Sequence, residues 1–285
     1  TEACNEYYRR EETLTEEFKA EVFEALRELE RQTGKVLGSP ENPLLLSIRS
    51  GAYFSMPGMM DTILNLGLNE DTVEALAGST GNRTFALDCY RRFLQMYGDV
   101  VLNIEHSHFE RALEKCKEAF KVQSDQQLPS EGWEKVIARY KQIIEEESGG
   151  AFPQNPHDQL LEAIKAVFAS WNNPRAVVYR RLNQIPDHLG TAVNIQAMVF
   201  GNMGEDSGSG VAFTRNPATG EKQLYGEFLF NAQGEDVVAG IRTPLLISAL
   251  KEKFPHIYKE FTSICTNLEK HYRDMQDIEF TIERG

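Results

Sequence analysis

The sequence predicts an α+β fold in which a helical segment is inserted between two mixed lobes. Apolar residues between positions 70 and 150 recur at helical spacing. From residue 190 onward the pattern changes to a period of two, which is typical of strands with one exposed face. Helices and strands are therefore segregated along the chain, as in α+β proteins. The clearest helical stripe consists of Trp133, Val136, Ile137, Tyr140, Ile143 and Ile144.

The elements outside the helical segment follow from the same patterns. We expect a surface helix over 15–33 and a short buried strand over 43–49. Pro156 is at the first position of another helix, which ends or kinks at 172–174. The period-two region then predicts strands at 191–200, 210–216, 223–231 and 277–283, with a turn at 217–220 and a helix at 255–273.

Length and composition limit the class of protein. The chain has 285 residues, 41% hydrophobic and 26% charged, so it is long enough to bury a sizeable core as a soluble globular protein. Its net charge is −13, which argues against nucleic acid or an anionic membrane as a partner. A small polyanion held by local arginines remains compatible with that charge. No apolar run approaches the ~20 residues that span a bilayer.

The four cysteines are scattered along the chain and contain no Cys-x-x-Cys pair. We interpret them as free thiols in a reducing compartment, the cytoplasm or an organelle lumen, rather than in a secreted protein. The chain begins at Thr1 without an initiator Met and shows no signal segment. We therefore expect a fragment of a longer protein.

A loop after the first predicted strand has the composition of a phosphate-binding segment. Residues 49–61 contain Arg49, two serines and two glycines. Backbone N–H groups and a guanidinium are the donors that a phosphate needs. The alternative is an ordinary strand–helix connection with a solvated arginine. The spacing excludes a P-loop.

Two carboxylates alternate with apolar residues in the last predicted strand. Asp277 and Glu279 are two residues apart and therefore share one face. Mg²⁺ prefers one or two carboxylates together with substrate phosphates. The alternative is an edge strand with a polar outer face. The glycine-rich stretch 201–210 is equally open, either to close approach of a phosphate or to a long hairpin loop.

Several runs resemble the pyruvate, phosphate dikinase family, and together they extend over essentially the whole chain. The Met-Pro-Gly-Met-Met-Asp run favours this family over phosphoenolpyruvate synthase and the antibiotic-phosphorylating relatives. The similar runs are 46–51, 55–67, 210–217, 231–240 and 275–283.

The resemblance implies an ATP-grasp nucleotide-binding domain of an enzyme that converts ATP, phosphate and pyruvate to AMP, pyrophosphate and phosphoenolpyruvate. Its partners would be a phosphohistidine domain and a pyruvate-binding barrel of the same parent chain. We expect a first lobe formed by 1–67 with 158–198, a helical insert at 68–157 and a second lobe at 199–285.

The resemblance also assigns site residues. Arg49 and Arg92 would act on the phosphates as catalytic residues. Asp277 and Glu279 would hold Mg²⁺, in the same cleft as Arg49. Arg175 and Glu227 would dock the histidine domain. The residues implied to contact ATP are Arg49, Ser50, Gly58, Gln196, Met198, Gly208, Gly210, Asp277 and Glu279.

The family pattern extends beyond both ends of this chain. It begins upstream with a glycine-rich segment that carries an ATP-binding lysine, and it continues past Gly285 with a strand that carries nucleotide-contacting Gln and Arg. The alternative function is therefore a catalytically incompetent fragment that retains only the fold and an interdomain docking surface.

Overall fold

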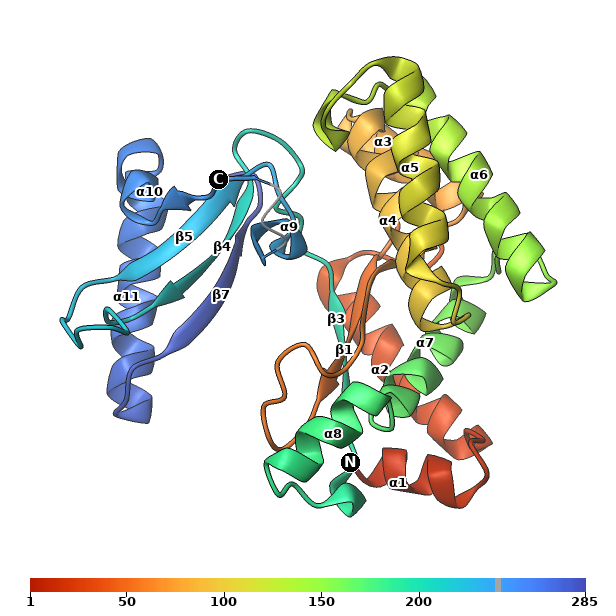
Figure 1. Ribbon diagram of the computed structural model, residues 1–285, viewed down its shortest axis with the longest axis horizontal. Helices are drawn as coiled ribbons and strands as arrows, with labels where there is room; N and C mark the ends of the chain where they lie inside the picture. Colours follow the sequence, from red (N-terminus) through yellow and green to blue (C-terminus); the bar gives the residue numbers. More distant parts are fainter. Residues whose placement is uncertain (239–241) are drawn as a thin grey trace. The chain divides into compact units, whose positions relative to one another are not determined.

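The computed structural model describes residues 1–238 and 242–285 and forms two compact units, Thr1–Met198 and Val199–Gly285. Residues 239–241, which include the end of the 231–240 run, lie outside the described residues. Each unit contains one antiparallel sheet together with helices (Figure 1). The mixed helix-and-sheet architecture confirms the predicted fold class.

The sheet of the first unit has the order β2-β1-β3, with β1 (Leu46–Gly51) between β2 (Thr62–Leu66) and β3 (Ala192–Ala197). Helix α7 (Pro156–Ser170) packs against all three strands. It begins where the sequence predicts, because Pro156 suits the first helical position and the Asn155 side chain accepts a hydrogen bond from the next backbone N–H.

Four helices form the predicted helical segment and lie side by side in Figure 1. The central helix α4 packs against α3, α5 and α6, and its aromatic side chains are buried. The predicted stripe on α6 is buried as well. The helices are α3 (Glu70–Thr80), α4 (Arg83–Val100), α5 (His106–Phe120) and α6 (Ser130–Ser148), with a 3₁₀ turn at Asp125–Gln127.

Three further helices complete the first unit. The structure confirms the predicted helix as α2 (Glu16–Thr33), which starts at a Thr15 cap and ends at Gly34 with φ of 67°. Helices α1 (Glu2–Arg9) and α8 (Pro174–Leu182) were not predicted from the sequence. On α8 only Ala176 and Arg180 are buried, so no apolar stripe marks it. A 3₁₀ turn at Asp187–Leu189 precedes β3.

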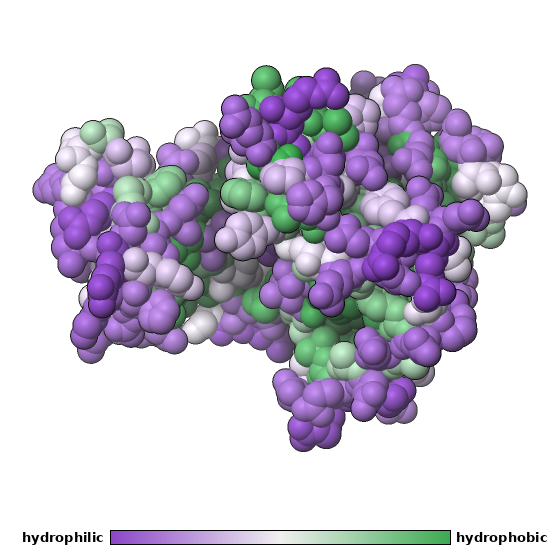
Figure 2. Space-filling model, turned by 90° about the horizontal axis from the view of Figure 1, so that it is seen from below, coloured by the Kyte–Doolittle hydropathy of each residue, from purple (hydrophilic) through white to green (hydrophobic). Residues whose placement is uncertain are grey.

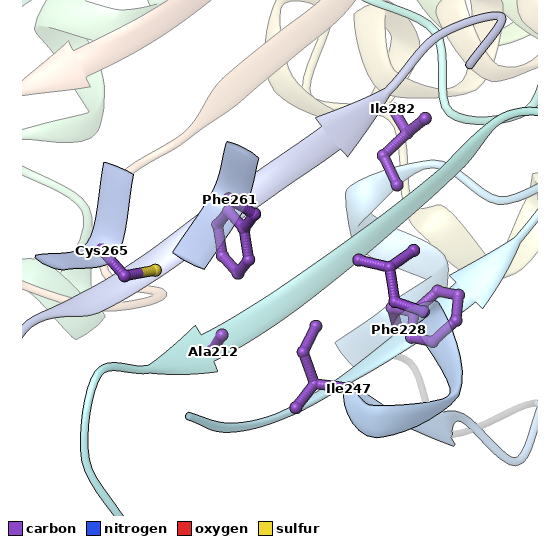
Figure 3. Close-up of a cluster of buried hydrophobic side chains, with 7 residues drawn as sticks. Ala212, Phe228, Ile247, Phe261, Cys265 and Ile282 are labelled. Carbon is purple, nitrogen blue, oxygen red and sulfur yellow. The ribbon is translucent and has the colours of Figure 1, made fainter. Parts of the chain in front are cut away.

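The sheet of the second unit has the order β6-β5-β4-β7. Helices α10 and α11 cover one face, and side chains from both sheet and helices meet in a buried core around Phe228, Phe261 and Ile282 (Figure 3). The elements are β4 (Gly208–Phe213), β5 (Tyr225–Phe230), α9 (Gly234–Val238), β6 (Leu245–Leu246), α10 (Ser248–Lys253), α11 (Pro255–Tyr272) and β7 (Asp277–Ile282).

Hydrophilic residues cover most of the face shown in Figure 2, in keeping with the charged composition. Within the described residues, no helix combines the length and the apolar character that a membrane crossing requires. The four cysteines are free thiols, and three of them are buried.

Candidate nucleotide site

Polar residues form one face of the β2-β1-β3 sheet. The strand register places Thr62 and Asn194 directly opposite Arg49, and Gln196 opposite Ser47. Residues directly opposite each other share a face, so these five side chains lie on the same side of the sheet. Leu46 and Ile48, which alternate with these positions in β1, are apolar and buried. We call the set Ser47, Arg49, Thr62, Asn194 and Gln196 the polar face.

Two of the predicted ligand-binding residues of the first unit, Arg49 and Gln196, lie on this face. Gln196 lies two residues beyond Asn194, or about 7 Å along the strand. Met198 follows β3, and its backbone N–H donates to the Leu45 carbonyl at 2.9 Å. Arg49, Asn194 and Gln196 are exposed. The arrangement suits an extended anionic ligand with its base near residue 198 and its phosphates near Arg49.

The loop after Arg49 joins β1 to β2 as a hairpin, so the alternative of a strand–helix connection is wrong. The reason is that the apolar run 62–66 forms a strand, paired with β1, before helix α3 begins. Met56 anchors the loop, because its side chain is buried in a cluster with Trp171, Ala176 and Ile185. Gly58 has φ of 70°, which glycine adopts without strain.

The end of this loop is tied to the start of α8. The Asp61 carboxylate accepts a hydrogen bond from Asn173 Nδ2 at 2.8 Å and forms an ion pair with Arg175. Arg175 Nε also donates to the Met59 carbonyl at 3.1 Å. The loop is therefore held at its base, while Tyr53 near its tip is 82% exposed. The docking role of Arg175 stays a prediction.

Arg92 lies on the side of α4 that faces β2. Met96 is one turn further along the same side, and its sulfur accepts a hydrogen bond from Leu64 N at 3.1 Å. Arg92 Nε donates to Asp88 Oδ2 at 3.0 Å, and the neighbouring Arg91 donates to the other oxygen at 2.5 Å. Burial alone raises the pKa of Asp88, but the two guanidiniums outweigh it and hold that pKa below its ordinary value.

A cavity of about 670 Å³ lies in the first unit beside the end of the loop. Each of the three basic side chains in its lining is paired with a carboxylate. Lys165 is 2.7 Å from Glu162, and His106 is 2.5 Å from Asp99. The third pair is that of Arg175 and Asp61. Of the sequence-predicted residues, Arg175 lines this cavity, and the paired charges leave its lining close to neutral.

Asp277 and Glu279 lie in β7, as predicted, and both are exposed on one face. The apolar residues between and after them, Ile278 and Phe280, pack against the core on the other face. Two exposed carboxylates on one strand fit Mg²⁺ that takes its remaining ligands from phosphates and water. Among the described residues, no group of three or more His, Cys, Asp or Glu side chains is arranged to hold a metal ion.

Gly208 and Gly210 lie in the first half of β4, which begins two residues before the predicted strand. A Cβ on Gly208 would lie 2.6 Å from the Leu229 carbonyl oxygen, and one on Gly210 would lie 2.5 Å from the Phe280 ring. Close packing in the sheet therefore requires glycine at both positions. Their contact with phosphates stays a prediction. Glu227, the other predicted docking residue, lies exposed in β5 opposite Val211.

Comparison with known proteins decides the family. The profile of the family described as "Pyruvate phosphate dikinase, AMP/ATP-binding domain" matches residues 8–259, which is most of the chain. The chain belongs to this family. Asp277 and Glu279 lie beyond the end of the matched range.

Individual pyruvate, phosphate dikinases match over the whole chain. The identity is 57% over 286 residues with the protein from Clostridium symbiosum and 55% over 297 residues with that from Rhizobium meliloti. It is 56% over 285 residues with the chloroplastic protein from Mesembryanthemum crystallinum. The chain covers 33%, 33% and 30% of these relatives, or about a third of their length.

Three residues of the polar face have no counterpart among the sequence-based predictions for this dikinase-family domain. Ser47, Thr62 and Asn194 lie beside predicted residues only because of strand pairing. The pairing partner of a strand 140 residues away cannot be read from local pattern. The available signal was Asn194 itself, since asparagine is uncommon inside strands.

Proposed function

We propose that this chain is the nucleotide-binding part of a pyruvate, phosphate dikinase. It binds Mg-ATP and phosphate and phosphorylates a histidine on a separate domain during phosphoenolpyruvate formation. The family membership and the names of the relatives support this proposal. The histidine domain and the pyruvate-binding barrel belong to the parent protein, in the cytoplasm or an organelle lumen.

The proposed roles divide between binding and charge neutralisation. Arg49 and Arg92 neutralise negative charge on the phosphates. Ser50, near the end of β1, and Gly58, in the loop 52–61, act at the phosphates, and Gln196 and Met198 meet the adenine base. Phosphoryl transfer depends mainly on positioning and electrostatic stabilisation, which a guanidinium beside a preorganised loop provides.

Mg²⁺, when bound, neutralises charge on the phosphate oxygens. We assign it to Asp277 and Glu279, which offer hard oxygen ligands on one face of β7. Gly208 and Gly210 allow the backbone of β4 to come close to the transferring phosphates.

The observation that carries the proposal within the structure is the strand register of β1 and β3. It aligns Arg49 with Asn194, and Gln196 lies two residues further along the same exposed face. A guanidinium and a predicted base-binding strand thus share one surface of the first unit, as an ATP site requires.

Isothermal titration calorimetry tests the proposal. The chain is expected to bind Mg-ATP, with about tenfold or weaker affinity after Arg49→Ala, since a charged hydrogen bond to phosphate is lost. Asp277→Asn is expected to reduce the dependence of ATP binding on Mg²⁺. Arg27→Ala, at an exposed position of α2, is the matched control and leaves affinity unchanged. Absence of Mg-ATP binding by the unmodified chain contradicts the proposal and favours the docking-fragment alternative.

A further inference from the structure

Arg49 has a neutral polar neighbour on each side across the sheet. Thr62 lies opposite it on β2, and Asn194 lies opposite it on β3. The Cβ atoms of directly opposite residues are about 5 Å apart, so the carboxamide at 194 and the Arg49 guanidinium can contact the same ligand.

Gly51 leaves the space that the Asn194 side chain occupies. Gly51 is two residues beyond Arg49 and therefore on the same face. A Cβ added to Gly51 would lie 2.8 Å from Asn194 Nδ2. The carboxamide thus lies over the end of β1, at the point where the loop 52–61 begins. An alanine at position 51 would displace the amide without moving the backbone.

Folding does not explain the asparagine. Asparagine is unfavourable inside strands, and position 194 is exposed, so burial does not compensate for it. Its carboxamide makes no hydrogen bond to any residue that the structure describes. A polar residue that disfavours its own secondary structure and makes no stabilising contact there is typical of a functional position.

We propose that Asn194 is a phosphate-binding residue that acts beside Arg49. Its Nδ2 group donates a hydrogen bond to an oxygen of the phosphate that Arg49 binds. Because the carboxamide is neutral, it neither repels the guanidinium nor forms an ion pair with it. This assignment rests on the proposed function and names a further residue for the same site. The class of ligand is the polyphosphate part of a nucleotide, rather than its base.

The test compares Mg-ATP with AMP as calorimetric ligands. We expect Asn194→Ala and Gly51→Ala each to weaken Mg-ATP binding about tenfold, because a hydrogen bond to a charged group is lost or displaced. Asn194→Asp weakens it further, since the new carboxylate pairs with Arg49 and repels phosphate. AMP binding changes by less than about twofold in all three variants.

The control is Asn183→Asp, the same substitution at an exposed residue that follows α8. It leaves both affinities unchanged. If the unmodified chain binds Mg-ATP and the Asn194 variants bind it equally well, this inference is overturned and the proposed function stands. Equal losses for ATP and AMP overturn it too, because they indicate a structural role. No binding by the unmodified chain overturns both.

Discussion

Asp88 shows how one residue can hold two charges in place. Its carboxylate is 16% exposed and lies between the guanidiniums of Arg91 and Arg92, which are 7% and 11% exposed. Arg91 also lies over the Trp133 ring, 5.1 Å from the centroid. Removing the carboxylate takes away the negative charge that lies between two largely buried cations, which is costly in a low dielectric. Asp88 thus positions Arg92, a predicted phosphate-binding residue, as well as stabilising α4.

We predict that Asp88→Asn lowers the free energy of unfolding at pH 7 by about 3 kcal/mol or more. Because the folded-state pKa of Asp88 lies below its ordinary value, its contribution is complete above that ordinary value of about 4 and is lost as pH falls through the lowered pKa. The difference in free energy of unfolding between the unmodified chain and Asp88→Asn, measured by urea denaturation, should therefore shrink in strong acid. Glu118→Gln, which removes one negative charge at an exposed position, should lower the free energy of unfolding by less than about 0.5 kcal/mol. A pH-independent difference would contradict the assignment.

At the scale of elements, a glycine sets the approach of α4 to α5. A Cβ added to Gly98 in α4 would lie 2.5 Å from the fully buried Phe109 ring of α5. Glycine normally weakens a helix by about 1 kcal/mol relative to alanine. The close contact with the Phe109 ring, and not helix propensity, therefore explains why glycine is at position 98.

We predict that Gly98→Ala destabilises the protein by about 1–3 kcal/mol despite the better helix former, because the ring must shift within a packed core. Gly78→Ala in α3 is the matched control, since nothing lies within 4 Å of its Cβ position. That change should stabilise by about 0.5–1 kcal/mol. Thermal denaturation of both variants measures the contrast, and stabilisation by both would show that the contact is not tight.

The elements that the sequence predicted well are those with strong local signals. The helical spacing of apolar residues in α2, Pro156 at the start of α7 and the alternation in β7 are local, and the structure confirms the three elements. Helix α8 was missed because it buries too few apolar residues to show a stripe. The polar face could be predicted only in part, because Asn194 reaches Arg49 through pairing of strands about 140 residues apart.

At the scale of the whole molecule, each unit has its own core. In the second unit, Phe228 and Cys265 belong to one buried cluster (Figure 3). Both tryptophans, Trp133 and Trp171, lie in the first unit. Tryptophan fluorescence therefore reports on the first unit. Labelling of Cys265 reports on the second, since burial raises the pKa of its thiol to about 11 and the reactive thiolate is scarce until the core opens.

We predict that Phe228→Ala, at a fully buried position, destabilises the second unit by about 3–5 kcal/mol. Labelling of Cys265 in denaturant should then begin at lower concentration, while the fluorescence midpoint stays where it was. Phe93→Ala, fully buried in α4, is the reciprocal control and should shift the fluorescence midpoint alone. Because separate cores permit separate unfolding, two transitions are expected. If Phe228→Ala shifted the Cys265 labelling and the fluorescence midpoint equally, the two units would unfold as one cooperative structure. The binding affinity of a variant in one unit could then be interpreted only together with the stability of the other unit.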